Sequence, residues 1–144
     1  MAGYSSRSLI EKLGIKPESR IAILKAPRGY LRTLGKLPRG VSVSRSGRGP
    51  LEFIQYFTRA RSDLNAKLPS LNRRLRDHGA LWISWPKKAA RVSTDVTEDT
   101  IRDIALPLGL VDVKVCAIDD TWSGLKLVRR RERRTLPLGA RPSR

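Results

Sequence analysis

The apolar residues of the chain gather in short runs, and the most continuous run is ALWISW at residues 80–85. Only Ser84 interrupts it, a glycine precedes it, and Pro86 and two lysines follow. A short apolar run bounded by Gly and Pro is typical of a strand buried on both faces of a sheet. In open α/β sheets, ligands bind just beyond the carboxyl ends of such strands. The pattern therefore places the function of the chain near Pro86, Lys87 and Lys88.

Shorter apolar or alternating runs predict further strands at residues 21–24, 41–44, 53–57, 111–118 and 125–128. Residues 119–124 predict a turn that joins the last two strands into an antiparallel hairpin. Along the first strand of this hairpin, strict alternation predicts that four small apolar side chains share one face: Val111, Val113, Val115 and Ala117.

Helical periodicity is clearest where four leucines recur at steps of four, three and four: Leu64, Leu68, Leu71 and Leu75. Ser62 is the expected N-cap, Pro69 predicts a kink, and His78 with Gly79 is expected to close this helix. Three further helical segments are predicted at residues 5–13, 30–34 and 97–105, the last of them capped by Thr97 or Thr94.

Strands and helices alternate along most of the chain, which predicts a mainly parallel sheet with helices on both faces. The fold class is therefore a compact three-layer α/β sandwich with a C-terminal antiparallel hairpin. The length of 144 residues suits one domain, which we place at residues 1–130. Residues 131–144 are rich in arginine and proline and are expected to form a basic, disordered tail.

The net charge of +17 is unevenly distributed. Residues 1–50 hold eleven Lys or Arg and two Asp or Glu, residues 51–128 hold twelve and ten, and residues 129–144 hold seven and one. Such an excess favours sequence-independent contact with nucleic acid, above all through the RRRERR run at 129–134, which has no aromatic residues for base stacking. The alternative is that these charges only keep the surface solvated.

The cysteine content and the hydropathy of the chain indicate its cellular compartment. A single cysteine excludes an intramolecular disulfide and fits a reducing compartment. The first residues lack the apolar core of a signal peptide, and no apolar run is long enough to cross a membrane. We therefore expect a cytoplasmic protein with no membrane partner.

Five segments carry a resemblance to known proteins: GYSSRSLIEKLGIKP near the start, LKAPRGY, WPKK, TDVTED, and GLVDVKVCAIDDTWSGLKLV at 109–128. They resemble a family of small bacterial proteins of unknown function. The order of elements also resembles the Rossmann-like fold of S-adenosylmethionine-dependent methyltransferases, which ends in an antiparallel hairpin. The resemblance implies this fold and a bacterial origin, and it implies no mechanism.

Two features depart from methyltransferases. Their first loop is rich in glycine so that the backbone approaches the cofactor, whereas here residues 25–30 read KAPRGY. An acidic residue that would hold a ribose is expected after the second strand, where Ser44, Arg45 and Ser46 stand. The scaffold is therefore expected to be degenerate, and the sequence leaves the cofactor unknown.

Cations and hydroxyls follow the first and the central predicted strands. We expect the two strands to lie near each other, which would gather one anion site from Lys25, Arg28, Lys87, Lys88, Ser93 and Thr94. The alternative is that the lysines only mark where a buried strand meets water. Trp122 is a candidate for stacking on a ligand ring, with packing against the sheet as the alternative.

Other reactive residues give weaker signals. Asp119 and Asp120 could hold a metal with Asp95, but neighbouring strand residues point to opposite faces. Cys116 lies in an apolar strand, where a thiol is inert, and His78 is expected to cap a helix. No catalytic residues or metal ligands are therefore assigned.

Three functions remain open from the sequence. The first is a non-catalytic or small-anion-binding protein on the degenerate scaffold. The second is an enzyme acting on a small anionic or nucleotide-like substrate. The third is a non-specific nucleic-acid-associated protein acting through its basic ends.

Overall fold

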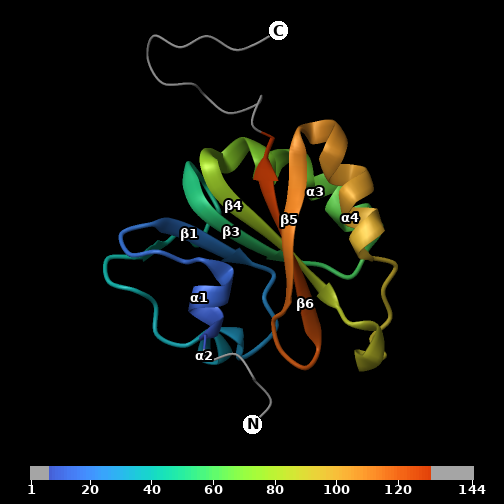
Figure 1. Cartoon of the computed structure of the whole chain (residues 1–144), viewed down its shortest axis with the longest axis horizontal. Helices are drawn as coiled ribbons and strands as arrows, with labels where there is room; N and C mark the ends of the chain where they lie inside the picture. The colour runs from blue at the N-terminus through green and yellow to red at the C-terminus, as the bar shows by residue number, and fades with distance from the viewer. Residues whose placement is uncertain (1–6, 131–144) are drawn as a thin grey trace, which may run out of the picture.

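The computed structural model describes residues 7–130, and a six-stranded sheet in the order β2-β1-β3-β4-β6-β5 forms its centre (Figure 1). The first four strands run parallel, and β6 runs antiparallel to both β4 and β5. This confirms the mainly parallel sheet with a C-terminal hairpin. The strands are β1 (Arg20–Leu24), β2 (Ser42–Val43), β3 (Leu51–Phe57), β4 (Leu75–Pro86), β5 (Leu110–Ala117) and β6 (Trp122–Arg129).

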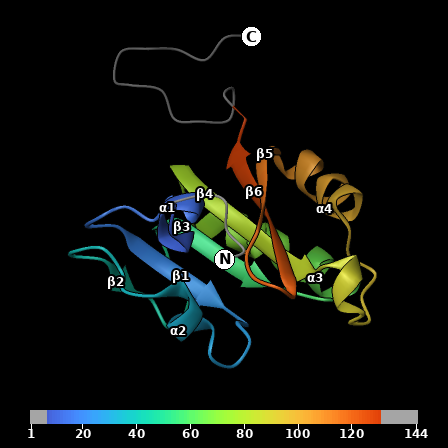
Figure 2. The same cartoon turned by 60° about the horizontal axis from the view of Figure 1, so that its bottom comes forward.

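Helices cover both faces of the sheet, which confirms the three-layer prediction (Figures 1 and 2). α3 (Arg61–Arg74) and α4 (Glu98–Ala105) bury their apolar stripes in one core cluster. α1 (Leu9–Leu13) and α2 (Tyr30–Leu34) pack in a second cluster on the opposite face. Two single-turn 3-10 helices, η1 (Lys88–Ala90) and η2 (Leu106–Leu108), lie in the connections.

Helix ends follow the expected capping chemistry in two places. Thr97 caps α4 because its hydroxyl accepts the N–H of Thr100, so Thr97 rather than Thr94 is the cap. Gly14 ends α1 in the left-handed conformation, as its place in the sequence predicted. The start predicted at residue 5 and the predicted tail at 131–144 lie outside the described residues.

The boundaries predicted for the long helix were wrong at both ends. α3 begins after Ala60, so Ser62 lies inside it, and the helix continues through Pro69. It ends at Arg74, because Leu75 starts β4 by pairing with Leu51 of β3. Leu75 fits the leucine spacing of a helix, and only its tertiary partner identifies it as a strand residue.

His78 lies within β4 and not at a helix end, so its predicted capping role was wrong. The β3–β4 register is irregular between the pairs Leu51–Leu75 and Phe53–Ala80, where residues 76–79 of β4 bulge out. Gly79 closes this bulge, since a Cβ there would lie 2.8 Å from the Glu52 carbonyl oxygen. The extra residues cannot be foreseen from an alternating pattern.

A second bulge corrects the prediction for the hairpin. The β5–β6 register shifts between Asp112 and Lys114, leaving Val113 as an extra residue. Val111 then pairs with Val128 and Val115 with Leu125, which point to opposite faces of β6. The four small residues therefore do not share one face. Val113 and Val115 remain 54% and 50% exposed on this edge strand.

The hairpin turn is shorter than predicted. β6 already begins at Trp122, because the Asp119 carboxylate accepts the backbone N–H groups of Thr121 and Trp122, both at 2.8 Å. Such a side-chain bond closes a turn locally. None of the helices in residues 7–130 is long and apolar enough to cross a membrane.

The strand order reverses between β1 and β3. From β1 the chain crosses to β2 on one side and then returns to form β3 on the other side. β3 therefore lies between β1 and β4, the two strands that were expected to lie near each other. A reversal of this kind opens a crevice at the carboxyl ends of the two strands, the usual ligand site of such sheets.

Candidate functional site

A pocket of about 520 Å³ lies at this reversal, beyond the carboxyl ends of β1 and β3. Three of the predicted site residues, Lys25, Ser93 and Trp122, line it together. The residues that directly follow β3 complete the lining: Thr58, Arg59 and Ala60, with Asp63 from α3 and Phe57 from the end of β3. A pocket of this size accommodates a small-molecule ligand.

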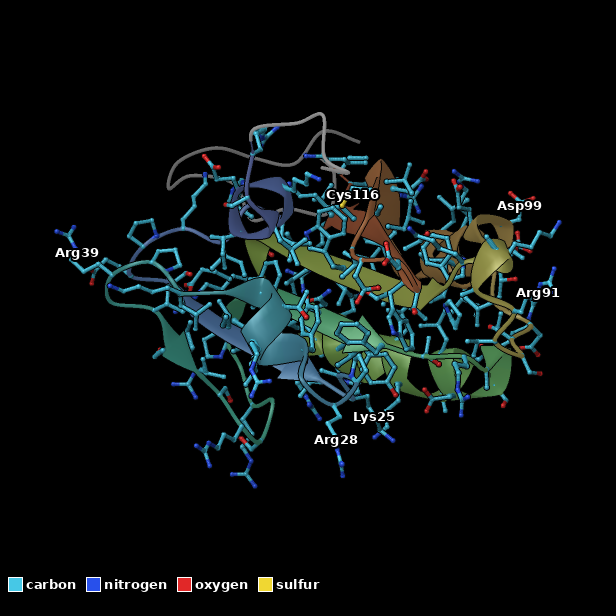
Figure 3. All side chains as sticks on the ribbon, turned by 90° about the horizontal axis from the view of Figure 1, so that it is seen from below. Lys25, Arg28, Arg39, Arg91, Asp99 and Cys116 are labelled. Carbon is cyan, nitrogen blue, oxygen red and sulfur yellow. The ribbon has the colours of Figure 1, made fainter. Side chains whose placement is uncertain are left out.

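Lys25 holds an unusual backbone at the edge of this pocket. Its φ angle is +61°, in the left-handed region that an ordinary side chain enters only at a cost. The loop thus keeps a glycine-like conformation, with a lysine among the residues that line the pocket. Figure 3 shows Lys25 and Arg28 on the same loop, both pointing outward from the protein.

Asp63 is the carboxylate of the pocket, and two hydroxyls hold it. Its Oδ2 accepts from Tyr56 at 2.7 Å and from Thr58 at 2.9 Å. Asp63 also lies in the first turn of α3, where the helix dipole favours a negative charge. Burial, and then the hydrogen bond to Asp63, raise the pKa of Tyr56, which keeps its phenol a proton donor.

Aromatic rings support the pocket from the α1 and α2 face of the sheet. Tyr30, Phe57 and Trp122 form a row with edge-to-face contacts at 4.8 and 5.1 Å between ring centroids. The Tyr30 hydroxyl donates to Gln55 at 2.8 Å, and Gln55 donates to Ser84 at 3.1 Å. Trp122 is half-buried in this row, so it packs against the sheet and also faces the pocket.

The loop after β4 is fastened to the loop after β3. The Thr94 hydroxyl donates to the Arg59 carbonyl at 2.7 Å, and the Asp95 carboxylate accepts the backbone N–H of Arg61 at 2.7 Å. Thr94 also accepts the backbone N–H of Val96, so its hydroxyl is engaged on both sides. These bonds give Thr94 a structural role and position its neighbour Ser93 at the pocket.

The remaining predicted residues lie elsewhere. Lys88 and Thr94 line a separate pocket of about 440 Å³ beside the first turn of α4. Lys87 uses its backbone N–H to extend the β4–β6 ladder by donating to Thr121 at 2.7 Å. Arg28 is exposed on the loop before α2. The structure therefore divides the six-residue anion site predicted from sequence.

The side chains considered for metal binding or nucleophilic chemistry do not converge. Asp119 closes the hairpin turn, and Asp95 fastens the loop at Arg61. Within residues 7–130, no three His, Cys, Asp or Glu side chains gather as metal ligands. Cys116 is half-buried, and burial raises the pKa of its thiol, which disfavours the nucleophilic thiolate.

Sequence reasoning missed Thr58, Arg59 and Asp63. The signal was present, because TRARSD follows the apolar strand FIQYF directly. The strand order was needed to place that segment between the loops after β1 and β4.

Comparison with solved structures identifies the class of fold. The ribosomal protein L11 methylase from Lactobacillus delbrueckii subsp. bulgaricus matches with a TM-score of 0.58 and 14% identity, over 85% of this chain and 75% of that chain. A SAM-dependent methyltransferase from Aquifex aeolicus gives a TM-score of 0.58 and 14% identity, over 83% and 86%. Magnesium protoporphyrin IX methyltransferase from Synechocystis PCC 6803 gives 0.58 and 11%, over 84% and 78%.

The chain thus has the mixed α/β fold of SAM-dependent methyltransferases. No protein-family model and no curated protein matches the sequence. The resemblance to a family of small bacterial proteins therefore gains no support from these comparisons.

The residues present do not fit S-adenosylmethionine in the manner of this fold. In the loop after β1, Lys25 lines the pocket, where a glycine-rich turn would let the backbone approach the cofactor. The segment after β2 offers Ser44 bonded to the Arg48 carbonyl, followed by Arg45, and no carboxylate for a ribose. The β1–β2 half is also small, since β2 has two residues.

Proposed function

We propose that the chain is a non-catalytic protein that binds a small phosphorylated molecule at the β1–β3 pocket. The observation that carries this proposal is Lys25, a residue with a strained backbone that lines a pocket at the reversal of strand order. Strained backbone persists at functional sites when the surrounding structure compensates for its cost. The methyltransferase-like fold supplies the position of the pocket and no chemistry.

The charges around the pocket support an anionic ligand. Lys25 and Arg59 bring two cations, and Ser93 brings a hydroxyl. The carboxylate Asp63 is already bonded to Tyr56 and Thr58, so it is poorly placed to act as a general base. Cations and hydroxyls that converge on one cavity recognise phosphate or carboxylate groups.

Thermal shift with defined ligands tests the proposal. We expect inorganic phosphate or adenosine monophosphate to raise the melting temperature, because a ligand that binds only the folded state stabilises it. S-adenosylmethionine is expected to give no larger shift than adenosine without phosphate. An equal rise with S-adenosylmethionine and adenosine monophosphate, or no rise with any anion at millimolar concentration, contradicts the proposal.

Replacing Lys25 by glycine is expected to stabilise the protein while removing ligand binding. Glycine adopts the left-handed backbone without the steric cost of a side chain, so the free energy of unfolding should rise by about 1 kcal/mol. The ammonium group is lost, so the anion-induced shift in melting temperature should disappear. Urea unfolding and thermal shift measure the two effects separately.

Arg91 provides the matched control for Lys25→Gly. Its φ angle is +56°, and Figure 3 shows it far from Lys25. Arg91→Gly should raise the free energy of unfolding in the same direction and leave the anion-induced shift intact. If Lys25→Gly kept the full shift, the pocket assignment would be wrong.

A further inference from the structure

A second basic surface lies away from the pocket, on the face of the β5–β6 hairpin beside α1. Four lysines form it: Lys12, Lys16, Lys114 and Lys126. Lys114 and Lys126 are direct cross-strand partners on β5 and β6. The Lys114 ammonium donates to the Lys12 carbonyl at the end of α1, at 3.2 Å. We call these four residues the lysine cluster.

None of the four lysines forms an ion pair within residues 7–130. Every ion pair in this part of the chain uses an arginine. On the opposite face of the same hairpin, Asp112 is paired with Arg102 at 2.9 Å. The protein therefore pairs charge on one face of the hairpin and leaves like charges together on the other.

Like charges placed directly opposite each other destabilise a sheet. Burial, and then the charges of Lys114 and Lys16, lower the pKa of Lys126, which is the direction expected where positive charges crowd together. A polyanion laid across the cluster would relieve this repulsion. The contacts and the strand register thus give a physical reason for the cluster to bind an external anion.

We propose that the lysine cluster binds the phosphate backbone of nucleic acid without reading its sequence. Lysine binds phosphate as a point charge, and contacts to backbone phosphates carry no direct sequence information. A membrane surface is less suited, because the tryptophans that would anchor it are buried or half-buried: Trp82, Trp85 and Trp122. This surface is independent of the anion pocket, which lies at the loops after β1 and β3.

The experiment compares the full chain with Lys114→Gln/Lys126→Gln. Fluorescence anisotropy measures binding to a labelled single-stranded DNA homopolymer and to a mixed-sequence duplex over a series of salt concentrations. Each lysine that contacts a phosphate contributes about one to the salt slope, so the slope should fall by about two and binding should weaken roughly tenfold. Both sequences should be affected alike.

The matched control is Arg45→Gln/Arg48→Gln, which removes the same charge from the loop after β2. The sheet order places this loop at the edge opposite β5. Both variants keep residues 131–144, so any contribution of the basic tail is the same in each. Lys16→Gln, at an exposed position, reports on the cluster if the double variant fails to fold.

The proposal is supported if the cluster variant, or Lys16→Gln in its place, loses affinity and salt dependence while the Arg45 and Arg48 control does not. Equal losses in both variants would show that only net charge matters and would overturn it. Failure of the unmodified chain to bind either DNA also overturns it. So does binding to phosphatidylserine vesicles without binding to DNA.

Discussion

Replacing Trp82 by phenylalanine is expected to lower the free energy of unfolding by about 3 kcal/mol. Trp82 is completely buried in β4, and its indole N–H donates to the Leu13 carbonyl at 3.0 Å. Phenylalanine leaves that carbonyl without its donor and leaves a gap against Gly124, where the ring already lies too close for a Cβ. Urea unfolding followed by circular dichroism measures the loss.

The hydrogen bond also fastens α1 to the sheet. α1 has only five residues, too few to be stable without tertiary packing. Amide hydrogen exchange in α1 should therefore accelerate in Trp82→Phe more than exchange in α3. Trp85→Phe is the control, because Trp85 packs in the cluster on the opposite face and makes no bond to α1. If the two variants were equally destabilised and α1 exchange were unchanged, the indole bond would have no anchoring role.

Replacing Gln55 by leucine is expected to lower the free energy of unfolding by about 3 kcal/mol, although leucine is apolar and of similar size. Gln55 and Ser84 are 0% exposed and Tyr30 is 2% exposed, so each hydroxyl that loses its partner stays away from water. The Gln55 amide is the middle of a buried hydrogen-bond network, because it accepts from the Tyr30 hydroxyl and donates to the Ser84 hydroxyl. Losing the amide leaves both hydroxyls without this hydrogen-bond partner, and chemical denaturation measures the loss of stability.

Removing the whole network tests this account. In Gln55→Leu/Tyr30→Phe/Ser84→Ala no buried hydroxyl is left without a partner, so most of the lost stability should return. The triple variant should therefore be more stable than the single one. If the three substitutions were simply additive, unsatisfied hydroxyls would not be the cause of the loss.

Most of the sheet could be predicted from sequence because its strands are short apolar runs with distinct limits. Residues 21–24, 53–57 and 80–85 all lie in observed strands, and the two hairpin strands form close to their predicted places. The errors share one physical origin. Leu75 and Val113 obey a local period, but the register with a neighbouring strand decides their structure. Such pairings connect residues far apart in the chain.

The candidate site was predicted less completely than the fold. Lys25, Ser93 and Trp122 meet at one pocket, whereas Lys88 and Thr94 line another. Carboxyl ends of strands could be located from the chain alone, but their order across the sheet could not. The role of the Thr94 hydroxyl could not be predicted either, because its hydrogen bond to the Arg59 carbonyl depends on how two loops fold against each other.

The bulge at Val113 disfavours pairing of two copies of the chain through the β5 edge. β5 is an outer strand with two half-exposed valines, and a regular strand of this kind would offer an open ladder to a second molecule. The extra residue bends the strand and breaks the spacing of its outward N–H and C=O groups. Lys114 adds a charge at the same point. The irregularity that spoils the alternating pattern therefore protects the protein against aggregation through its edge.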